Sequence, residues 1–89
     1  MITEKLQNAI NEQITAEMWS SNLYLAMSFY MDKEGYCGMA SWLKKQAHEE
    51  HEHACELASY IIKRGGKAKL DKIDVCLLYT SDAADDLLC

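Results

Sequence analysis

The stretch Glu49-Glu50-His51-Glu52-His53 decides the fold, because it places ionisable side chains on an otherwise apolar stripe of a predicted helix. Glu50 and His53 are three residues apart, so on a helix they share one face and can bind the same metal ion. Burying a carboxylate and an imidazole costs several kcal/mol unless they are paired, and a metal ion is a common partner. With about 100° of rotation per residue, a set of apolar or small residues falls within roughly 60° of Glu50: Met39, Leu43, Ala47, Ala54, Leu57 and Ile61.

The composition is typical of one small folded domain. The chain has 89 residues, of which 49% are hydrophobic, enough for a packed core and too many for a disordered segment. Its net charge of −5, from 14 acidic and 9 basic side chains without a basic patch, argues against nucleic acid and suits a cation as ligand. We expect no membrane span and no signal peptide. The 4 cysteines have no C-x-x-C spacing, which predicts reduced thiols in a cytoplasmic protein.

A first long helix is predicted over about 4–33, because residues 3–33 contain neither Gly nor Pro. Thr3 is the expected N-cap and Gly35 the expected C-terminal stop, while Glu17 lies at the centre of the inward apolar face. The opposite face is apolar as well. Because such a helix must bury both faces, we expect the second face to contact another subunit, the alternative being exposed aromatic residues. This face consists of Trp19, Leu23, Ala26 and Tyr30.

A second helix is predicted over about 38–64, after a turn over 32–38 that contains Gly35 and Gly38. It ends at Gly65 and Gly66. Residues 67–75 are expected to form a connecting loop, and the tail 76–89 to be irregular or to form one or two helical turns. The predicted fold class is therefore all-α: a long antiparallel two-helix hairpin over 1–75, followed by a separate tail. The outward face of the second helix is expected to be solvated: Lys44, Lys45, His48, Glu52, Cys55, Glu56, Ser59 and Lys63.

Counting from the turn brings three ionisable side chains to one level. Glu17 lies 18 residues before Gly35, and Glu50 and His53 lie 15 and 18 residues after it. Antiparallel packing therefore predicts that the three meet within about one helical turn of the same height. Oxygen ligands with a single imidazole favour iron or manganese over a thiolate-type zinc site, and a buried ion pair without metal is the alternative. One Glu with one Glu-x-x-His is half the ligand set of a di-metal carboxylate bundle.

Other ionisable or hydroxyl-bearing residues are weaker candidates. Three residues lie on the outward side of the second helix: His48, His51 and Cys55. They are predicted either to bind zinc occasionally or to be surface residues without a ligating role. Glu49 is about 100° from the buried stripe and binds a neighbouring ion or faces water. Tyr24 either hydrogen-bonds a metal-bridging carboxylate or is a core aromatic with a hydrated hydroxyl group.

The sequence over residues 1–75 resembles the first half of a bacterial non-haem ferritin, a member of the ferritin-like di-iron family. That resemblance implies half of a four-helix bundle and a cytoplasmic ferroxidase, an Fe(II):oxygen oxidoreductase that oxidises Fe(II) with O2 or peroxide and stores the product in a multi-subunit shell. The matching segments are Asn11-Glu12-Gln13-Ile14-Thr15-Ala16-Glu17-Met18-Trp19-Ser20-Ser21-Asn22-Leu23-Tyr24 and His48-Glu49-Glu50-x-x-His53.

The resemblance also implies roles for individual residues. Glu17, Glu50 and His53 correspond to iron ligands, with Glu50 bridging the two ions of a non-haem di-iron centre. Glu49 falls where some bacterial members have a ligand to a third iron, and Tyr24 corresponds to the tyrosine beside the site. The face formed by Trp19, Leu23, Ala26 and Tyr30 corresponds to a contact between subunits.

The resemblance leaves three hypotheses for the function. The family's third and fourth long helices, with their glutamate ligands, and its short fifth helix have no counterpart here, and residues 76–89 are expected to be a non-family, artefactual tail. In the first hypothesis the chain carries an incomplete ferroxidase site. In the second, two copies pair into a four-helix bundle with a symmetric di-iron site. This arrangement is similar to that of encapsulated ferritin-like proteins. In the third, the chain is a non-catalytic helical hairpin or interaction module.

Overall fold

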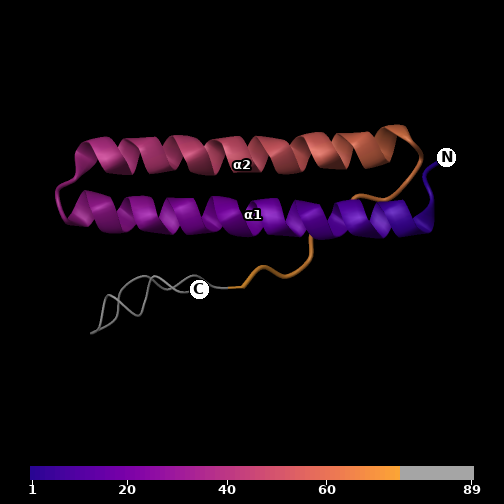
Figure 1. Cartoon of the computed structure of the whole chain (residues 1–89), viewed down its shortest axis with the longest axis horizontal. Helices are drawn as coiled ribbons and strands as arrows, with labels where there is room; N and C mark the ends of the chain where they lie inside the picture. The colour runs from indigo at the N-terminus through magenta and orange to yellow at the C-terminus, as the bar shows by residue number, and fades with distance from the viewer. Residues whose placement is uncertain (75–89) are drawn as a thin grey trace.

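The chain folds as two long antiparallel helices. A computed structural model describes residues 1–74, in which α1 spans Glu4–Lys33 and α2 spans Cys37–Lys63. The helices lie side by side along nearly their whole length (Figure 1), in a molecule 49 Å long. Within residues 1–74 there is no strand, so the predicted all-α hairpin is confirmed. The expectation of an irregular or short-helical tail over 76–89 lies outside the described residues.

Both helices begin and end close to where the sequence predicts. The Thr3 hydroxyl accepts a hydrogen bond of 3.2 Å from the backbone N–H of Leu6, which caps one of the free donors at the start of α1. Gly35 and Gly65 follow the two helices with φ of +86° and +78°, a left-handed conformation that glycine adopts without strain. The predicted stops at these glycines are therefore confirmed.

The turn between the helices is shorter than predicted, and Gly38 lies inside the first turn of α2 instead of in the connection. The backbone N–H of Tyr36 bonds the Met31 carbonyl at 2.8 Å, and that of Gly35 bonds the Asp32 carbonyl at 3.1 Å. These two bonds form a Schellman motif, which reverses the chain direction around Gly35 alone. A second glycine is not needed for the reversal, so α2 begins early.

The buried interface between the helices is narrow. Ser21 of α1 donates a hydrogen bond of 2.7 Å to the carbonyl of Ala47 in α2, so its hydroxyl is satisfied at a point where the small alanine lets the backbones approach. Met39 was expected on the buried stripe but is 50% exposed, because the hairpin covers only part of that stripe. The buried hydrophobic residues within 1–74 are Ile14, Ala40, Leu43, Ala47, Ala54 and Ile61.

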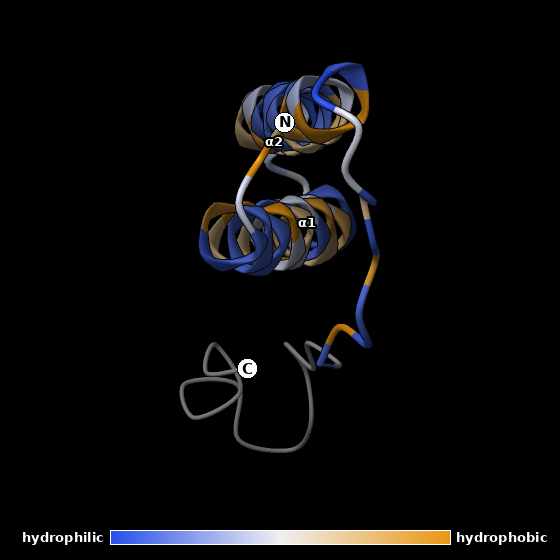
Figure 2. Cartoon of the chain, turned by 90° about the vertical axis from the view of Figure 1, so that its right-hand side faces the viewer, coloured by the Kyte–Doolittle hydropathy of each residue, from blue (hydrophilic) through white to orange (hydrophobic). Residues whose placement is uncertain are grey.

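The segment after α2, expected as a connecting loop, turns back and is fastened to α1. Figure 2 shows it passing from α2 alongside α1. The amide of buried Asn11 donates to the Lys67 carbonyl at 3.0 Å and accepts from the Lys69 N–H at 2.9 Å. Gln7 accepts from the Lys67 N–H at 3.0 Å. These contacts satisfy backbone groups of the segment and hold it against the first half of α1.

The described part of the chain contains no helix with the length and apolar character that crossing a membrane requires.

Candidate metal centre

Glu17 of α1 and Glu50 and His53 of α2 meet between the two helices, as the count from Gly35 predicts. One ligand atom from each lies within 4.8 Å of the other two. The Nδ1 atom of His53 is 3.6 Å from Oε2 of Glu17 and 3.7 Å from Oε1 of Glu50. Ligand atoms that each lie about 2.0–2.2 Å from one ion are at most about 4.4 Å apart, so the two His53 distances suit a shared ion and the two carboxylates would need to approach by at most a few tenths of an ångström.

The site is sheltered at the carboxylates and exposed at the imidazole. The side chains of Glu17 and Glu50 are 17% and 21% exposed, whereas that of His53 is 54% exposed. Oε2 of Glu17 is buried without a hydrogen-bond partner in the part of the chain that the structure describes. A buried oxygen without a donor is costly, and a bound cation would satisfy it. The residues therefore fit a metal ion.

The two carboxyl groups titrate as a pair. A hydrogen bond to Glu17 raises the pKa of Glu50, and burial and the negative charge of Glu17 raise it further. The pKa of Glu17 is lowered, mainly because Glu50 can donate a hydrogen bond to it when Glu50 is protonated and because Gln13 donates one, against the opposing effect of burial. Glu50 therefore retains a proton more readily than Glu17, because neighbouring carboxylates disfavour double ionisation. A divalent cation would replace that proton and neutralise both groups.

Gln13 is a residue of the site that the sequence reasoning did not identify. Its Nε2 atom donates a hydrogen bond of 3.0 Å to Oε1 of Glu17, the carboxylate oxygen that does not face His53. Gln13 precedes Glu17 by four residues, a spacing at which helical side chains contact each other, and this was the signal available in the sequence. The bond orients the Glu17 carboxylate so that its second oxygen points at the other two ligands.

The remaining candidates are placed differently. Glu49 is half-buried, and its charge contributes to the raised pKa of Glu50, so it lies near the site without joining the three-residue cluster. Tyr24 is half-buried on α1, and among residues 1–74 no hydrogen bond links it to the cluster. His48 faces outward, with its Nε2 atom 3.2 Å from a carboxylate oxygen of Glu52.

The arrangement favours a hard or borderline divalent ion. Two carboxylates and one imidazole are the donor set expected for iron or manganese, whereas structural zinc sites are richer in thiolates. All three ligands come from one hairpin, and the exposed imidazole marks the side that the hairpin leaves open. Further ligands can therefore reach an ion only from that side.

Comparisons with known proteins show the family to which this chain belongs. A family model of a ferritin-like domain matches residues 7–85, a range that overlaps the stretch 76–89, where no resemblance was expected. A bacterial non-heme ferritin of Bacteroides fragilis is 72% identical over 75 residues, which cover 84% of this chain and 47% of that protein. One from Staphylococcus epidermidis is 41% identical over 73 residues, 82% of this chain and 44% of that protein.

Solved structures show the same likeness. The open-pore ferritin from the archaeon Archaeoglobus fulgidus matches with a TM-score of 0.81 and 39% identity, over 84% of this chain and 46% of that one. A Chlorobium tepidum ferritin matches with a TM-score of 0.81 and 27% identity, over 84% and 46%. The chain spans about half the length of the relatives it matches.

Proposed function

Because this chain belongs to the ferritin-like family, we propose that it binds Fe(II) through Glu17, Glu50 and His53 and takes part in oxidising it for iron storage. The observation that carries this proposal is the convergence of the three side chains on a buried Glu17 oxygen that has no donor among the described residues. Fe(II) is here a substrate, and the protein contributes the ligands that hold it.

The ligands also favour the oxidation chemically. In the proposed reaction Glu50 would bridge two ions, while Glu17 and His53 would bind one of them. Two Fe(II) ions would each give one electron and become Fe(III), while O2 with two protons becomes H2O2, or peroxide with two protons becomes two water molecules. Carboxylate oxygens stabilise the higher charge of Fe(III) more strongly than that of Fe(II), so anionic ligands make the ferric product more favourable.

We propose that the ligand set is completed by helices packed on the open side of the hairpin. The 54% exposure of the His53 side chain supports this, because a metal ligand in a bundle core is covered. A second copy of the chain would supply another Glu17, Glu50 and His53 and thereby a symmetric di-iron site. Assembly would also use the face of Trp19, Leu23, Ala26 and Tyr30, in a cytoplasmic setting that keeps the thiols reduced.

Anaerobic titration with Fe(II), followed by a pulse of O2 read at the ferric absorbance, tests the proposal. We expect at least one Fe(II) bound per chain, with binding and oxidation lost in Glu17→Ala and Glu50→Ala. Glu52→Ala is the matched control, because Glu52 lies on α2 like Glu50 but is exposed and pairs with His48, outside the proposed site. Unchanged iron binding in Glu17→Ala and Glu50→Ala would overturn the proposal and favour a non-catalytic hairpin.

A further inference from the structure

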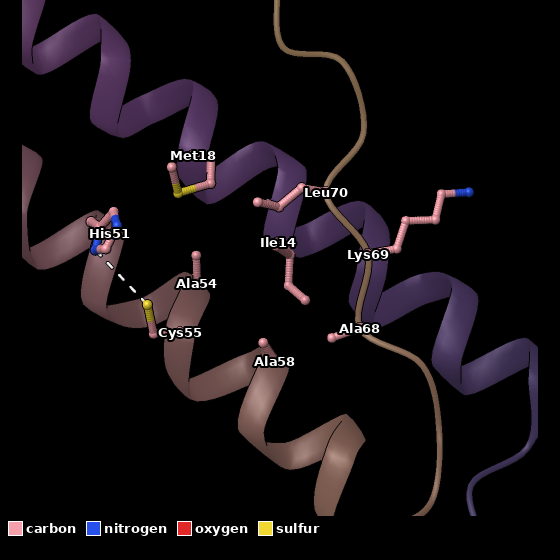
Figure 3. A pocket seen from close by; sticks show the side chains of 9 residues that line it. All are labelled: Ile14, Met18, His51, Ala54, Cys55, Ala58, Ala68, Lys69 and Leu70. Atoms are coloured by element: carbon pink, nitrogen blue, oxygen red, sulfur yellow. Dashed lines mark hydrogen bonds between the residues drawn. The ribbon is translucent and has the colours of Figure 1, made fainter.

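A second cluster of ligand atoms, chemically unlike the first, lies at a pocket beside the carboxylate site. This pocket, of about 380 Å³, is open to solvent and is lined by α1, α2 and the segment 68–70 (Figure 3). Ile14, Ala54 and Leu70 contribute to its largely apolar wall. His51 and Cys55, predicted to be surface residues or occasional zinc ligands, line it from α2, where the folded-back segment creates the pocket.

His51 and Cys55 are spaced as two ligands of one ion. They are four residues apart on α2, and the Nδ1 atom of His51 lies 3.8 Å from Sγ of Cys55. With metal–sulfur and metal–nitrogen bonds of about 2.3 Å and about 2.05 Å, a 3.8 Å separation corresponds to an S–metal–N angle of about 120°. That angle is trigonal and wider than the tetrahedral angle of structural zinc.

Met18 supplies a third soft donor from the opposite wall. It lines the same pocket from α1, and Figure 3 shows it together with His51 and Cys55. A thiolate, a thioether and an imidazole select Cu(I) over hard divalent ions such as Mg²⁺ or Mn²⁺. We propose that Cys55, His51 and Met18 bind one Cu(I) ion. The ion displaces the thiol proton of Cys55 to solvent, and no electron is transferred.

The surroundings of the pocket are compatible with a cation. Lys69 is the basic side chain among the lining residues, but its ammonium group points away from the pocket (Figure 3). It pairs with Asp71, with Nζ 3.4 Å from Oδ1. The largely apolar walls offer no hard oxygen ligands, which favours a soft monovalent ion over strongly hydrated divalent ions. None of the three proposed ligands belongs to the Glu17–Glu50–His53 cluster, so the copper site stands or falls independently of the proposed iron chemistry.

The test is anaerobic competition for Cu(I) against a chromogenic Cu(I) chelator, using full-length chains that keep a single cysteine. In the chain that keeps Cys55, with Cys37, Cys76 and Cys89 replaced by alanine, we expect one Cu(I) per chain. Adding His51→Ala or Met18→Leu should weaken binding at least about tenfold, since each removes one ligand of a small set. X-ray absorption should show two sulfur ligands and one nitrogen, with one sulfur lost in Met18→Leu.

The matched control is the chain that keeps only Cys37, a free and exposed cysteine at the start of α2. It should give up its Cu(I) to the chelator under conditions in which the chain that keeps Cys55 retains Cu(I). Equal retention by the two chains, or unchanged affinity in both His51→Ala and Met18→Leu, would overturn the proposal. Circular dichroism verifies that each variant keeps its helices, and exposure of His51 and Cys55 makes these substitutions mild for the fold.

Discussion

The negative charge of Glu50 lowers the stability of the metal-free fold but would bind a metal ion. Without metal, Glu50 adds a second carboxylate to a sheltered site, and two unit charges about 4 Å apart repel by about 1 kcal/mol even in water. Glu50→Gln keeps the shape and removes the charge. We expect the metal-free variant to be more stable than the wild type at pH 7 by on the order of 1 kcal/mol, and to lose the stabilisation by Fe(II), as measured by urea unfolding.

The pH dependence of this difference follows from the raised pKa of Glu50. Its contribution to folding is complete below the ordinary pKa of 4.5 and is lost as the pH rises through the folded-state value. The advantage of Glu50→Gln should therefore shrink as the pH falls from the raised folded-state pKa of Glu50 towards about 4.5, and should stay constant below that. Glu17, whose pKa is lowered, behaves oppositely and loses its contribution as the pH falls through its own folded-state value. An advantage that grows on acidification would contradict this account.

Gln13 offers a test of positioning at a residue that does not contact the metal in our proposal. Gln13→Ala removes the 3.0 Å hydrogen bond to Glu17 and frees its carboxylate to rotate. Because residues that orient ligands typically affect metal affinity 10–100-fold, we expect Fe(II) affinity to fall by about tenfold. The comparison is Asn22→Ala, an exposed change on the same helix. Calorimetric titration that finds equal affinities for the two variants would rule out the positioning role.

At the scale of elements, Gly66 at the end of α2 has two roles: it helps to end the helix, and it lies against residues at the start of α1. The N–H of Gly66 bonds the Ile61 carbonyl at 3.0 Å, completing the Schellman motif around Gly65. A Cβ atom at Gly66 would lie 2.6 Å from Oε1 of Gln7 and 2.8 Å from Cγ2 of Ile2. The glycine therefore permits the start of α1 to approach the end of α2.

Two glycine substitutions should consequently act in opposite directions. Gly66→Ala forces neighbouring atoms apart, and we expect a loss of about 1–3 kcal/mol in the free energy of unfolding. Gly38→Ala adds a methyl group that meets nothing within 4 Å inside α2, and should stabilise by about 0.5–1 kcal/mol. Thermal and urea unfolding measure both, and a Gly66→Ala protein as stable as Gly38→Ala would contradict the close approach.

At the scale of the molecule, residues 1–74 form a hairpin in which much of the apolar surface is exposed. Phe29, Met39 and Trp42 are 56%, 50% and 52% exposed, although large apolar side chains are usually buried. Trp19, Leu23, Ala26 and Tyr30 are half-buried on α1. A two-helix unit has too little interior for its hydrophobic side chains, which supports our proposal that it packs against further helices.

Sedimentation with and without anaerobic Fe(II) tests this at the scale of the molecule. We expect Fe(II) to favour dimers, because a second copy brings the missing ligands, and Leu23→Glu to weaken self-association at least about tenfold by burying a charge. The control is Asn22→Glu, which adds the same charge at an exposed neighbouring position. A wild type that stays monomeric with Fe(II) would contradict completion of the site by a second copy, and equal association of the two variants would contradict assembly through the face of Leu23.

The sequence alone was sufficient for the features that depend on local chain geometry. The N-cap at Thr3 and the stops at Gly35 and Gly65 follow from the capping preferences of these residue types. The meeting of Glu17, Glu50 and His53 follows from helical periodicity counted from one turn. Each residue of a helix adds a fixed rise and rotation, so the height and direction of a side chain can be calculated from the sequence once both helices and their connection are predicted.

Only the tertiary structure revealed the contacts made by chain segments without a repeating geometry. The attachment of Lys67 and Lys69 to Asn11 joins residues 56 and 58 positions apart, and it creates the pocket at His51 and Cys55. These contacts cannot be predicted from a repeating sequence pattern, because the path of an irregular segment depends on which buried polar groups it can hydrogen-bond. The exposure of His53 was likewise decided by three-dimensional packing, since a helix face is buried only where another element covers it.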